Sequence, residues 1–317
     1  MPGFVTHYIF GVNAFKQLTD SEIKNIIKKY RRAYAVGLQG PDVFFYHIPT
    51  AYGLKPDVGS YMHKKNTGEY FKQLINAFST IHDKDDYEIC VAYALGYMGH
   101  YLADTRLHPY VYGKVGPAAT SKVLGTHFGL ETDIDRCVLS HYKGQTFKDF
   151  NHKKVINISS KEQNAIATLL HKVLLATYDV DLSILSIKAA LLSFKAENYF
   201  VSDESKRKHK VIDFIEQHTV GYPVFSPLLV NDIEHMEDPC NEKHETWSNP
   251  WDEGSESTAS VYELIDAGVK EYSECIPLMA DALAQSYKGN MNSEAILGRL
   301  KNLSMTSGLD CSIELKR

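Results

Sequence analysis

Three side chains that can bind a metal ion recur every four residues in the segment GHYLADTRLHPYVYG: His100, Asp104 and His108. On an α-helix each residue advances by about 100°, so the three share one face within an arc of about 80°. Zinc ligands approach to about 2.0–2.2 Å, and α-carbons about 12 Å apart put His100 and His108 at the limit of reaching one ion. The spacing therefore fits two ions better, with Asp104 as a carboxylate that bridges them.

A second pair with the same spacing, His127 and Glu131, follows in GTHFGLETDIDRC. Together with His108 it makes a set of two imidazoles and one carboxylate, which leaves a fourth zinc position open for water, as in catalytic sites. A single pair of this kind is usually a hydrogen-bonded surface pair. Two pairs, the first inside an otherwise apolar helix, favour metal, because buried polar groups without partners cost several kcal/mol.

Three upstream segments place further candidate ligands near predicted helix ends: His7 in VTHYIFG, Asp42 in LQGPDVFFYHIP and His63 in SYMHKKNTGEYF. The Gly40–Pro41 pair forces a turn, so Asp42 should lie in a loop between aromatic residues. Each of the three also has a simpler interpretation. Asp42 has the residue type of a helix N-cap or an Asx-turn, and His63 is compatible with an ordinary loop histidine.

Composition indicates a globular protein that draws any metal ligands from histidines and carboxylates. The chain has 317 residues, 44% of them hydrophobic, and a formal net charge of -5. Its five cysteines are odd in number and form no CxxC motif, so they predict neither a disulfide framework nor a thiolate zinc site. The mild acidity argues against a stable complex with nucleic acid held by a basic field.

The N-terminal sequence has no basic segment followed by an apolar one, so no secretory signal is predicted and we expect a cytoplasmic protein. No apolar run is long enough for a transmembrane segment. We expect a single all-α domain over residues 1–317, with the ligands within 1–140. The remainder, 141–317, should be a helical scaffold interrupted by an acidic surface loop over 236–257.

Helical periodicity and capping signals dominate the chain, whereas alternating strand patterns are hard to find, which predicts the all-α class. Capping boxes are predicted at four pairs: Thr19 with Glu22, Asn66 with Glu69, Asp85 with Glu88, and Ser160 with Gln163. The helix that carries the opening motif should end near His108, since Pro109 disfavours helical conformation in the residue before it. Further helices are predicted over 184–198, 205–218, 257–287 and 292–302.

The ordered set of candidate ligands resembles the zinc-dependent phospholipase C family, whose relatives include the single-strand-specific zinc nucleases. The resemblance covers about the first 140 residues. It rests on eight positions in order: His7, Asp42, His63, His100, Asp104, His108, His127 and Glu131. In that family an all-α domain holds three zinc ions and hydrolyses phosphate esters, so the resemblance implies two to three Zn²⁺ ions here.

The resemblance also implies how the ligands are shared between ions. One zinc would take four ligands: Asp42, His63, His100 and the bridging Asp104. A second zinc would take three: His108, His127 and Glu131. The family often has a longer gap between the bridging aspartate and the next histidine, and no lipid-binding β-sandwich is recognisable after the helices.

A third zinc would use His7 and Asp104, completed by the amino group and carbonyl of the mature N-terminal residue. The family's mature chain usually begins with tryptophan, whereas this chain begins Met1–Pro2. We expect removal of Met1, which would place the free amine of Pro2 five residues before His7. A mass spectrum of the native protein that still contained Met1 would contradict this expectation.

The resemblance implies a hydrolase of phosphate esters, most simply a phospholipase C-like phosphodiesterase that uses hydroxide bridging the metal ions. Asp104 would bridge the ions and Asp42 would orient or deprotonate the water; the substrate would be a phospholipid headgroup or nucleotide-like ester. One alternative is a nuclease or nucleotidase. Another is an HD-type phosphohydrolase suggested by His82–Asp83, although a helix N-cap explains that pair equally simply. The third is a non-catalytic helical protein that metal ions stabilise.

Overall fold

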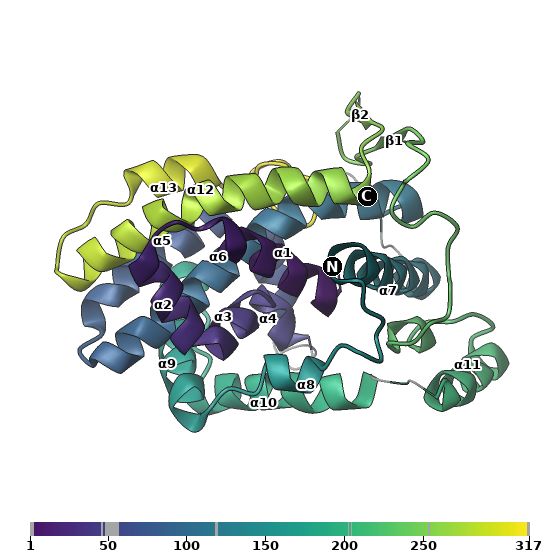
Figure 1. The fold of residues 1–317 in the computed structure, drawn as a ribbon, viewed down its shortest axis with the longest axis horizontal. Helices are drawn as coiled ribbons and strands as arrows, with labels where there is room; N and C mark the ends of the chain where they lie inside the picture. Colours follow the sequence, from purple (N-terminus) through teal and green to yellow (C-terminus); the bar gives the residue numbers. More distant parts are fainter. Residues whose placement is uncertain are drawn as a thin grey trace.

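The predicted all-α class is confirmed. The computed structural model describes residues 3–45, 47, 57–117, 120–201, 203, 205–252 and 254–315, and helices make up almost all of its regular structure (Figure 1). The strands form one short antiparallel ribbon, in which Trp247 pairs with Ser257 and Ser248 with Glu256. This ribbon lies in the segment predicted as an acidic loop. A membrane crossing needs a long helix of apolar side chains, and the described part of the chain contains none.

The elements of the N-terminal half are α1 (Phe4–Gln17), α2 (Ser21–Lys29), α3 (Arg31–Gly37), η1 (Gly40–Phe44), α4 (Val58–Lys64), α5 (Thr67–Ala77), η3 (Phe78–Thr80), α6 (Lys84–Val115) and α7 (Ser121–Lys143). The elements of the C-terminal half are α8 (His152–Val155), α9 (Ser160–Tyr178), α10 (Ile184–Val201), α11 (Arg207–Thr219), η4 (Ser226–Leu228), β1 (Trp247–Ser248), β2 (Glu256–Ser257), α12 (Val261–Tyr287) and α13 (Glu294–Leu300).

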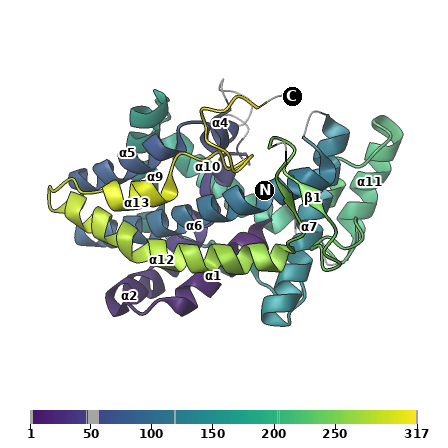
Figure 2. The ribbon, with the colours of Figure 1, turned by 90° about the horizontal axis from the view of Figure 1, so that it is seen from above.

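Helix α6 is the central element of the fold. Helices α1, α3, α7, α9 and α12 all pack against it, and Figure 2 shows α12 running alongside it. From Ile89 to Asp104 every side chain of α6 is buried, which explains why its sequence is apolar on all sides. Polar residues on such a helix lie inside the protein, so His100 and Asp104 must be satisfied by groups that other elements supply.

Two glycines allow α3 to cross α6 at backbone contact. A Cβ at Gly96 would lie 2.2 Å from the carbonyl oxygen of Tyr34, and a Cβ at Gly37 would lie 2.2 Å from that of Tyr93. The chain passes from α3 into η1 within three residues, and η1 contains Asp42. The close crossing therefore brings Asp42 next to the face of α6 that carries the histidines.

We expect Gly96→Ala to lower the free energy of unfolding by about 2–3 kcal/mol, because the added methyl group must push the α3 backbone away. Urea denaturation measures this change. Gly298→Ala on α13 is the matched control, since a Cβ there has nothing within 4 Å. In a helix that control should be neutral or stabilising by up to about 1 kcal/mol. Equal effects of the two substitutions would contradict the tight crossing.

The predicted end of the central helix near His108 is wrong, because α6 continues through Pro109 to Val115 and ends at Gly116. Proline removes one intrahelical hydrogen bond, but tertiary contacts hold this part of the helix in place. Tyr110 donates a hydrogen bond to the carbonyl of Pro239 at 2.7 Å. The backbone of Gly308 approaches the Thr105 carbonyl, which proline leaves without its helical partner, so closely that a Cβ would lie 2.6 Å from it.

Three of the four capping boxes were predicted one or two residues away from the observed caps, whereas Asn66 does occupy the N-cap position of α5. Asp20 rather than Thr19 caps α2, Asp83 rather than Asp85 caps α6, and Asn66 has a φ of 53° and makes no side-chain cap. The box of α9 is formed by Ser159 and Glu162, one residue earlier than predicted. Several adjacent residues are good caps, and the sequence alone does not decide between neighbours. The four later helices are confirmed as α10 to α13, with ends that differ by a few residues.

Candidate metal centre

The structure brings all eight predicted ligands into the interior, and none is more than 5% exposed. They come from five elements: His7 from α1, Asp42 from η1, His63 from α4, His100, Asp104 and His108 from α6, and His127 and Glu131 from α7. Pro2, the expected ligand from the N-terminus, lies outside the described residues. The remaining eight fall into two adjoining groups, which meet at His108.

The first group, the central cluster, consists of His7, Asp42, His63, His100 and Asp104. His63 Nε2 lies 3.1 Å from Asp42 Oδ1, and His100 Nε2 lies 3.1 Å from Asp104 Oδ2. His7 Nε2 lies 3.2 Å from Asp104 Oδ1, and His63 Nε2 lies 3.5 Å from Asp104 Oδ2. Two ligands at zinc bond lengths in a tetrahedron are about 3.3 Å apart. The separations in the central cluster are therefore those of ligands around shared ions.

The second cluster consists of His108, His127 and Glu131, whose ligand atoms lie within 4.8 Å of one another. His127 Nε2 is 2.8 Å from Glu131 Oε1, and His108 Nε2 is 3.9 Å from the same oxygen. The other nitrogen of His108, Nδ1, is 3.8 Å from Asp104 Oδ2. His108 thus joins the two clusters, while His100 and His108 belong to different ligand groups, as the spacing on the helix predicts.

Backbone carbonyls fix the orientation of three imidazoles. The Nδ1 atom contacts a carbonyl oxygen in each: His63 that of Gly59 at 2.7 Å, His100 that of Leu38 at 3.2 Å, and His108 that of Met305. A carbonyl only accepts hydrogen bonds, so Nδ1 must be the donor and, in the neutral ring, Nε2 carries the lone pair. Metal-ligating histidines are commonly held in this way.

The lone pairs of these imidazoles face carboxylate oxygens, which are also acceptors. Within the described part of the chain, the following buried atoms of the central cluster make no hydrogen bond: both ring nitrogens of His7, Nε2 of His63 and of His100, Oδ1 of Asp42, and both carboxylate oxygens of Asp104. An unpaired buried acceptor is costly, and two acceptors in contact need a cation between them. The residues present therefore fit a divalent metal ion.

The titration of the site agrees with this interpretation. Burial lowers the pKa of His7, His108 and His127, which keeps these rings in the neutral form that binds metal. Burial also opposes protonation of His63, but the carboxylates of Asp104 and Asp42 outweigh it and raise the pKa to about 9. In the metal-free chain, a proton on His63 therefore supplies some of the positive charge that a metal cation would supply.

The carboxyl of Asp104 lies at the middle of the central cluster and is also 3.8 Å from His108 Nδ1. Burial acts to raise its pKa, but His100, His108 and His7 lower it more, so the pKa lies well below its usual range. The group remains ionised although its side chain is fully buried. An ionised carboxylate surrounded by imidazoles on several sides has the position expected of a ligand that bridges metal ions.

Asp135 supports the site, although it is not among the ligands predicted from the sequence. Its buried carboxylate accepts hydrogen bonds from the backbone N–H groups of Val5 and Thr6, at 2.9 and 2.8 Å, and from the Thr6 hydroxyl at 2.6 Å. These bonds join the start of α1 to α7 immediately before His7. Burial raises the pKa of Asp135 to about 6, while the bonds from Thr6 and Val5 oppose the shift. The sequence does contain one signal for this residue, because Asp135 follows Glu131 by four residues and so lies on the same face of the helix.

We expect Asp135→Asn to lower the free energy of unfolding by about 1–3 kcal/mol, because an amide offers only one acceptor atom to these three donors. The displaced start of α1 should also weaken zinc binding through His7. Chemical denaturation and zinc titration measure the two effects. Asp20→Asn is the matched control, since Asp20 caps the exposed start of α2 and asparagine caps equally well. Equal stability of both variants would contradict this role.

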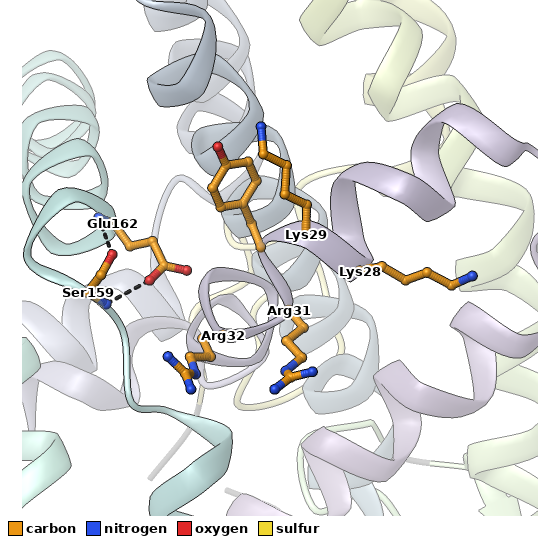
Figure 3. A pocket seen from close by; sticks show the side chains of 7 residues that line it. Lys28, Lys29, Arg31, Arg32, Ser159 and Glu162 are labelled. Carbon is orange, nitrogen blue, oxygen red and sulfur yellow. Dashed lines mark hydrogen bonds between the residues drawn. The ribbon is translucent and has the colours of Figure 1, made fainter.

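Two other features lie apart from the clusters. Asp83, considered as part of an HD-type site, is an exposed N-cap that accepts a hydrogen bond from the backbone N–H of Asp86 and pairs with Lys161. A basic hollow of about 340 Å³ lies between α2, α3 and the start of α9, and its lining includes Arg31, Arg32 and Glu162 (Figure 3). The hollow contains none of the eight predicted ligands.

The fold and the site together define an all-α protein with a buried cluster of imidazoles and carboxylates that could hold metal ions. The family sequence profile described as zinc dependent phospholipase C matches residues 6–181, which is more than half of the chain. The protein therefore belongs to the zinc-dependent phospholipase C family. Comparisons with curated proteins and with solved structures found no significant match.

Proposed function

We propose that the protein is a zinc-dependent phosphodiesterase that cleaves phospholipids in the manner of a phospholipase C. The observation that carries this proposal is the contact between acceptor atoms of imidazoles and carboxylates in the central cluster, where His100 Nε2 and Asp104 Oδ2 are 3.1 Å apart. Membership of the family supports the same conclusion. The second cluster of two imidazoles and one carboxylate also supports the proposal, because three protein ligands are the usual set of a catalytic zinc site.

We further propose a distribution of the ligands between ions. One zinc ion would be held by Asp42, His63, His100 and Asp104. A second ion would be held by His108, His127 and Glu131. A third would lie between His7 and Asp104, whose nearest atoms are 3.2 Å apart.

Bound zinc would supply positive charge that holds the phosphate ester and acidifies a water molecule. The chain's own contribution is to fix the geometry and to handle the proton. Asp42, which is 4% exposed in the middle of η1, would accept the proton of the attacking water on its carboxylate. The water oxygen then forms a bond to phosphorus, the bond from phosphorus to the glycerol oxygen breaks, and that oxygen takes up a proton to leave a diacylglycerol.

The proposal is tested by measuring zinc per chain and by assaying the same preparation on phosphatidylcholine, single-stranded DNA and a simple phosphodiester. We expect two to three zinc ions per chain and hydrolysis of phosphatidylcholine. Activity on DNA alone would replace the phospholipase assignment with a nuclease. A metal content near zero, or full zinc with no hydrolysis of any of the three substrates, would leave the non-catalytic alternative.

Asp42→Asn should lower kcat on phosphatidylcholine by about 10²–10⁴-fold, the usual contribution of a general base. Asp83→Asn is the control, because Asp83 is an exposed helix cap and asparagine caps as well as aspartate. It should have full activity. Loss of activity in Asp83→Asn, with Asp42→Asn unaffected, would favour the HD-type alternative.

A further inference from the structure

Helix α11 turns apolar side chains outward. Val211, Phe214 and Ile215 are 60%, 62% and 52% exposed, and they follow one another at the spacing of a helical stripe. Val220 and Phe225, which follow the helix, are also about half exposed. Surface helices normally turn such a stripe toward the core, so its exposure indicates an interaction surface. We call these five residues the α11 face.

The inward side of α11 is held by a charged residue instead. Glu216 is buried, and its carboxylate accepts hydrogen bonds from the backbone N–H groups of Val224, Phe225 and Ser226, and one from the Ser226 hydroxyl at 2.8 Å. This polar anchor fixes the helix on the segment that leads into η4. The apolar side chains of the α11 face are therefore not needed to attach the helix to the protein.

Basic residues flank the α11 face although the whole chain is acidic. Lys206, Arg207, Lys208 and Lys210 lie at the start of the helix, whereas Asp213 and the buried Glu216 are its acidic residues. Lys208 Nζ lies 4.9 Å from the centre of the Phe200 ring, which is 56% exposed. Exposed apolar and aromatic side chains beside lysine and arginine are typical of helices that lie in the surface of an anionic membrane.

Helix α11 is anchored on the segment around η4, and that segment packs on α7, the helix that carries His127 and Glu131 of the second cluster. Thr132 of α7 donates a hydrogen bond to the carbonyl of Pro227 in η4 at 2.7 Å, and η4 is the main neighbour of α11. A Cβ at Gly125 of α7 would lie 2.1 Å from the Pro223 carbonyl, so the two segments are in backbone contact. Figures 1 and 2 both show α11 at the edge of the molecule, beyond α7.

We propose that the α11 face and its basic flank dock the protein on the surface of an anionic lipid membrane. A second copy of the chain is a poorer occupant. The five residues of the α11 face carry no carboxylate that could pair with the basic flank of a partner copy, and Glu216 is buried and already bonded to the segment that leads into η4. The inference goes beyond the proposed function, since membrane binding is measurable without turnover.

The test is cosedimentation of the zinc-loaded protein with phosphatidylcholine vesicles, with and without phosphatidylserine. We expect tighter binding to the vesicles with phosphatidylserine, and weaker binding as salt is added. Replacing Phe214 and Ile215 together by serine should reduce the partition coefficient by about tenfold or more. Replacing Arg207 and Lys210 by glutamine should reduce it by about fivefold per charge on vesicles containing phosphatidylserine.

Two control variants test whether the loss of any exposed apolar side chain, or of any exposed cation, would weaken vesicle binding equally. Met291→Ser removes an equally exposed apolar side chain (62%) before α13, and Lys270→Gln removes an exposed cation on α12. Both should bind vesicles like the unaltered chain. Phe214→Trp provides a readout in a folded protein, because the new indole should give a blue-shifted emission when vesicles are added.

Three outcomes would overturn the inference: no vesicle binding by the unaltered chain, equal binding by all variants, or a dimer that the Phe214 and Ile215 substitutions dissociate. Hydrolysis of a short-chain phosphatidylcholine below its micellar concentration distinguishes this failure from failure of the proposed function. The surface variants should hydrolyse that monomeric lipid at the normal rate. Vesicle binding without any lipid hydrolysis would instead contradict the proposed function, while the proposal that the α11 face docks on membranes would still hold.

Discussion

Asp104→Asn is expected to lower zinc affinity by at least about 100-fold and to abolish measurable phosphodiester hydrolysis. The two carboxylate oxygens of Asp104 lie 3.1 Å from His100 Nε2 and 3.2 Å from His7 Nε2. An amide has the same shape but lacks the negative charge that would bridge two cations. Even changes to residues that only hold a metal ligand in place cost about 10–100-fold in metal affinity. Loss of a bridging ligand should cost more, because it weakens more than one ion.

The same substitution should leave the fold intact. The amide nitrogen of asparagine can donate a hydrogen bond to a neutral imidazole, so it replaces a contact between two acceptors by a normal hydrogen bond. We therefore expect the metal-free Asp104→Asn protein to be at least as resistant to urea as the metal-free unaltered chain. Zinc per chain, activity and urea denaturation are measured on one preparation, with Asp86→Asn at the start of the same helix as the control. If the variant retained both zinc and activity, Asp104 would not be a metal ligand of the site.

Local spacing predicted the part of the site that one helix carries. His100, Asp104 and His108 lie on one face of α6 because the helical repeat alone fixes their relative positions. The pair on α7 follows for the same reason. The assignment of His7, Asp42 and His63 to particular metal ions depended on the family resemblance, because no spacing rule relates residues on different elements.

The groups that hold the ligands in place were not predictable in this way. The carbonyl of Met305 that orients His108 is 197 residues away in the chain, and Asp135 acts on Val5 and Thr6 across 130 and 129 residues. A backbone carbonyl leaves no trace in residue types. The continuation of α6 past Pro109 has a similar origin, since tertiary contacts outweighed a local preference.

Removal of zinc is expected to destabilise the protein strongly. A ligand that binds only the folded state at about 1,000 times its dissociation constant contributes about 4 kcal/mol, which corresponds to a Tm shift of about 5–10 °C for a chain of this size. The central cluster should be sensitive in particular, because without a cation its buried acceptor atoms face one another. Thermal unfolding before and after chelation, and after zinc is returned, measures the shift.

Asp104→Asn also separates the contribution of the metal from that of the chelator. If zinc stabilises the fold through this carboxylate, chelation should lower the Tm of the unaltered chain and have little effect on that of Asp104→Asn. An equal shift in both proteins would place the stabilising metal elsewhere. If chelation lowers the Tm while the zinc-loaded protein hydrolyses no phosphodiester, the same ligands serve only the fold. The combination of melting and turnover therefore distinguishes a catalytic metal centre from a structural one with the same residues.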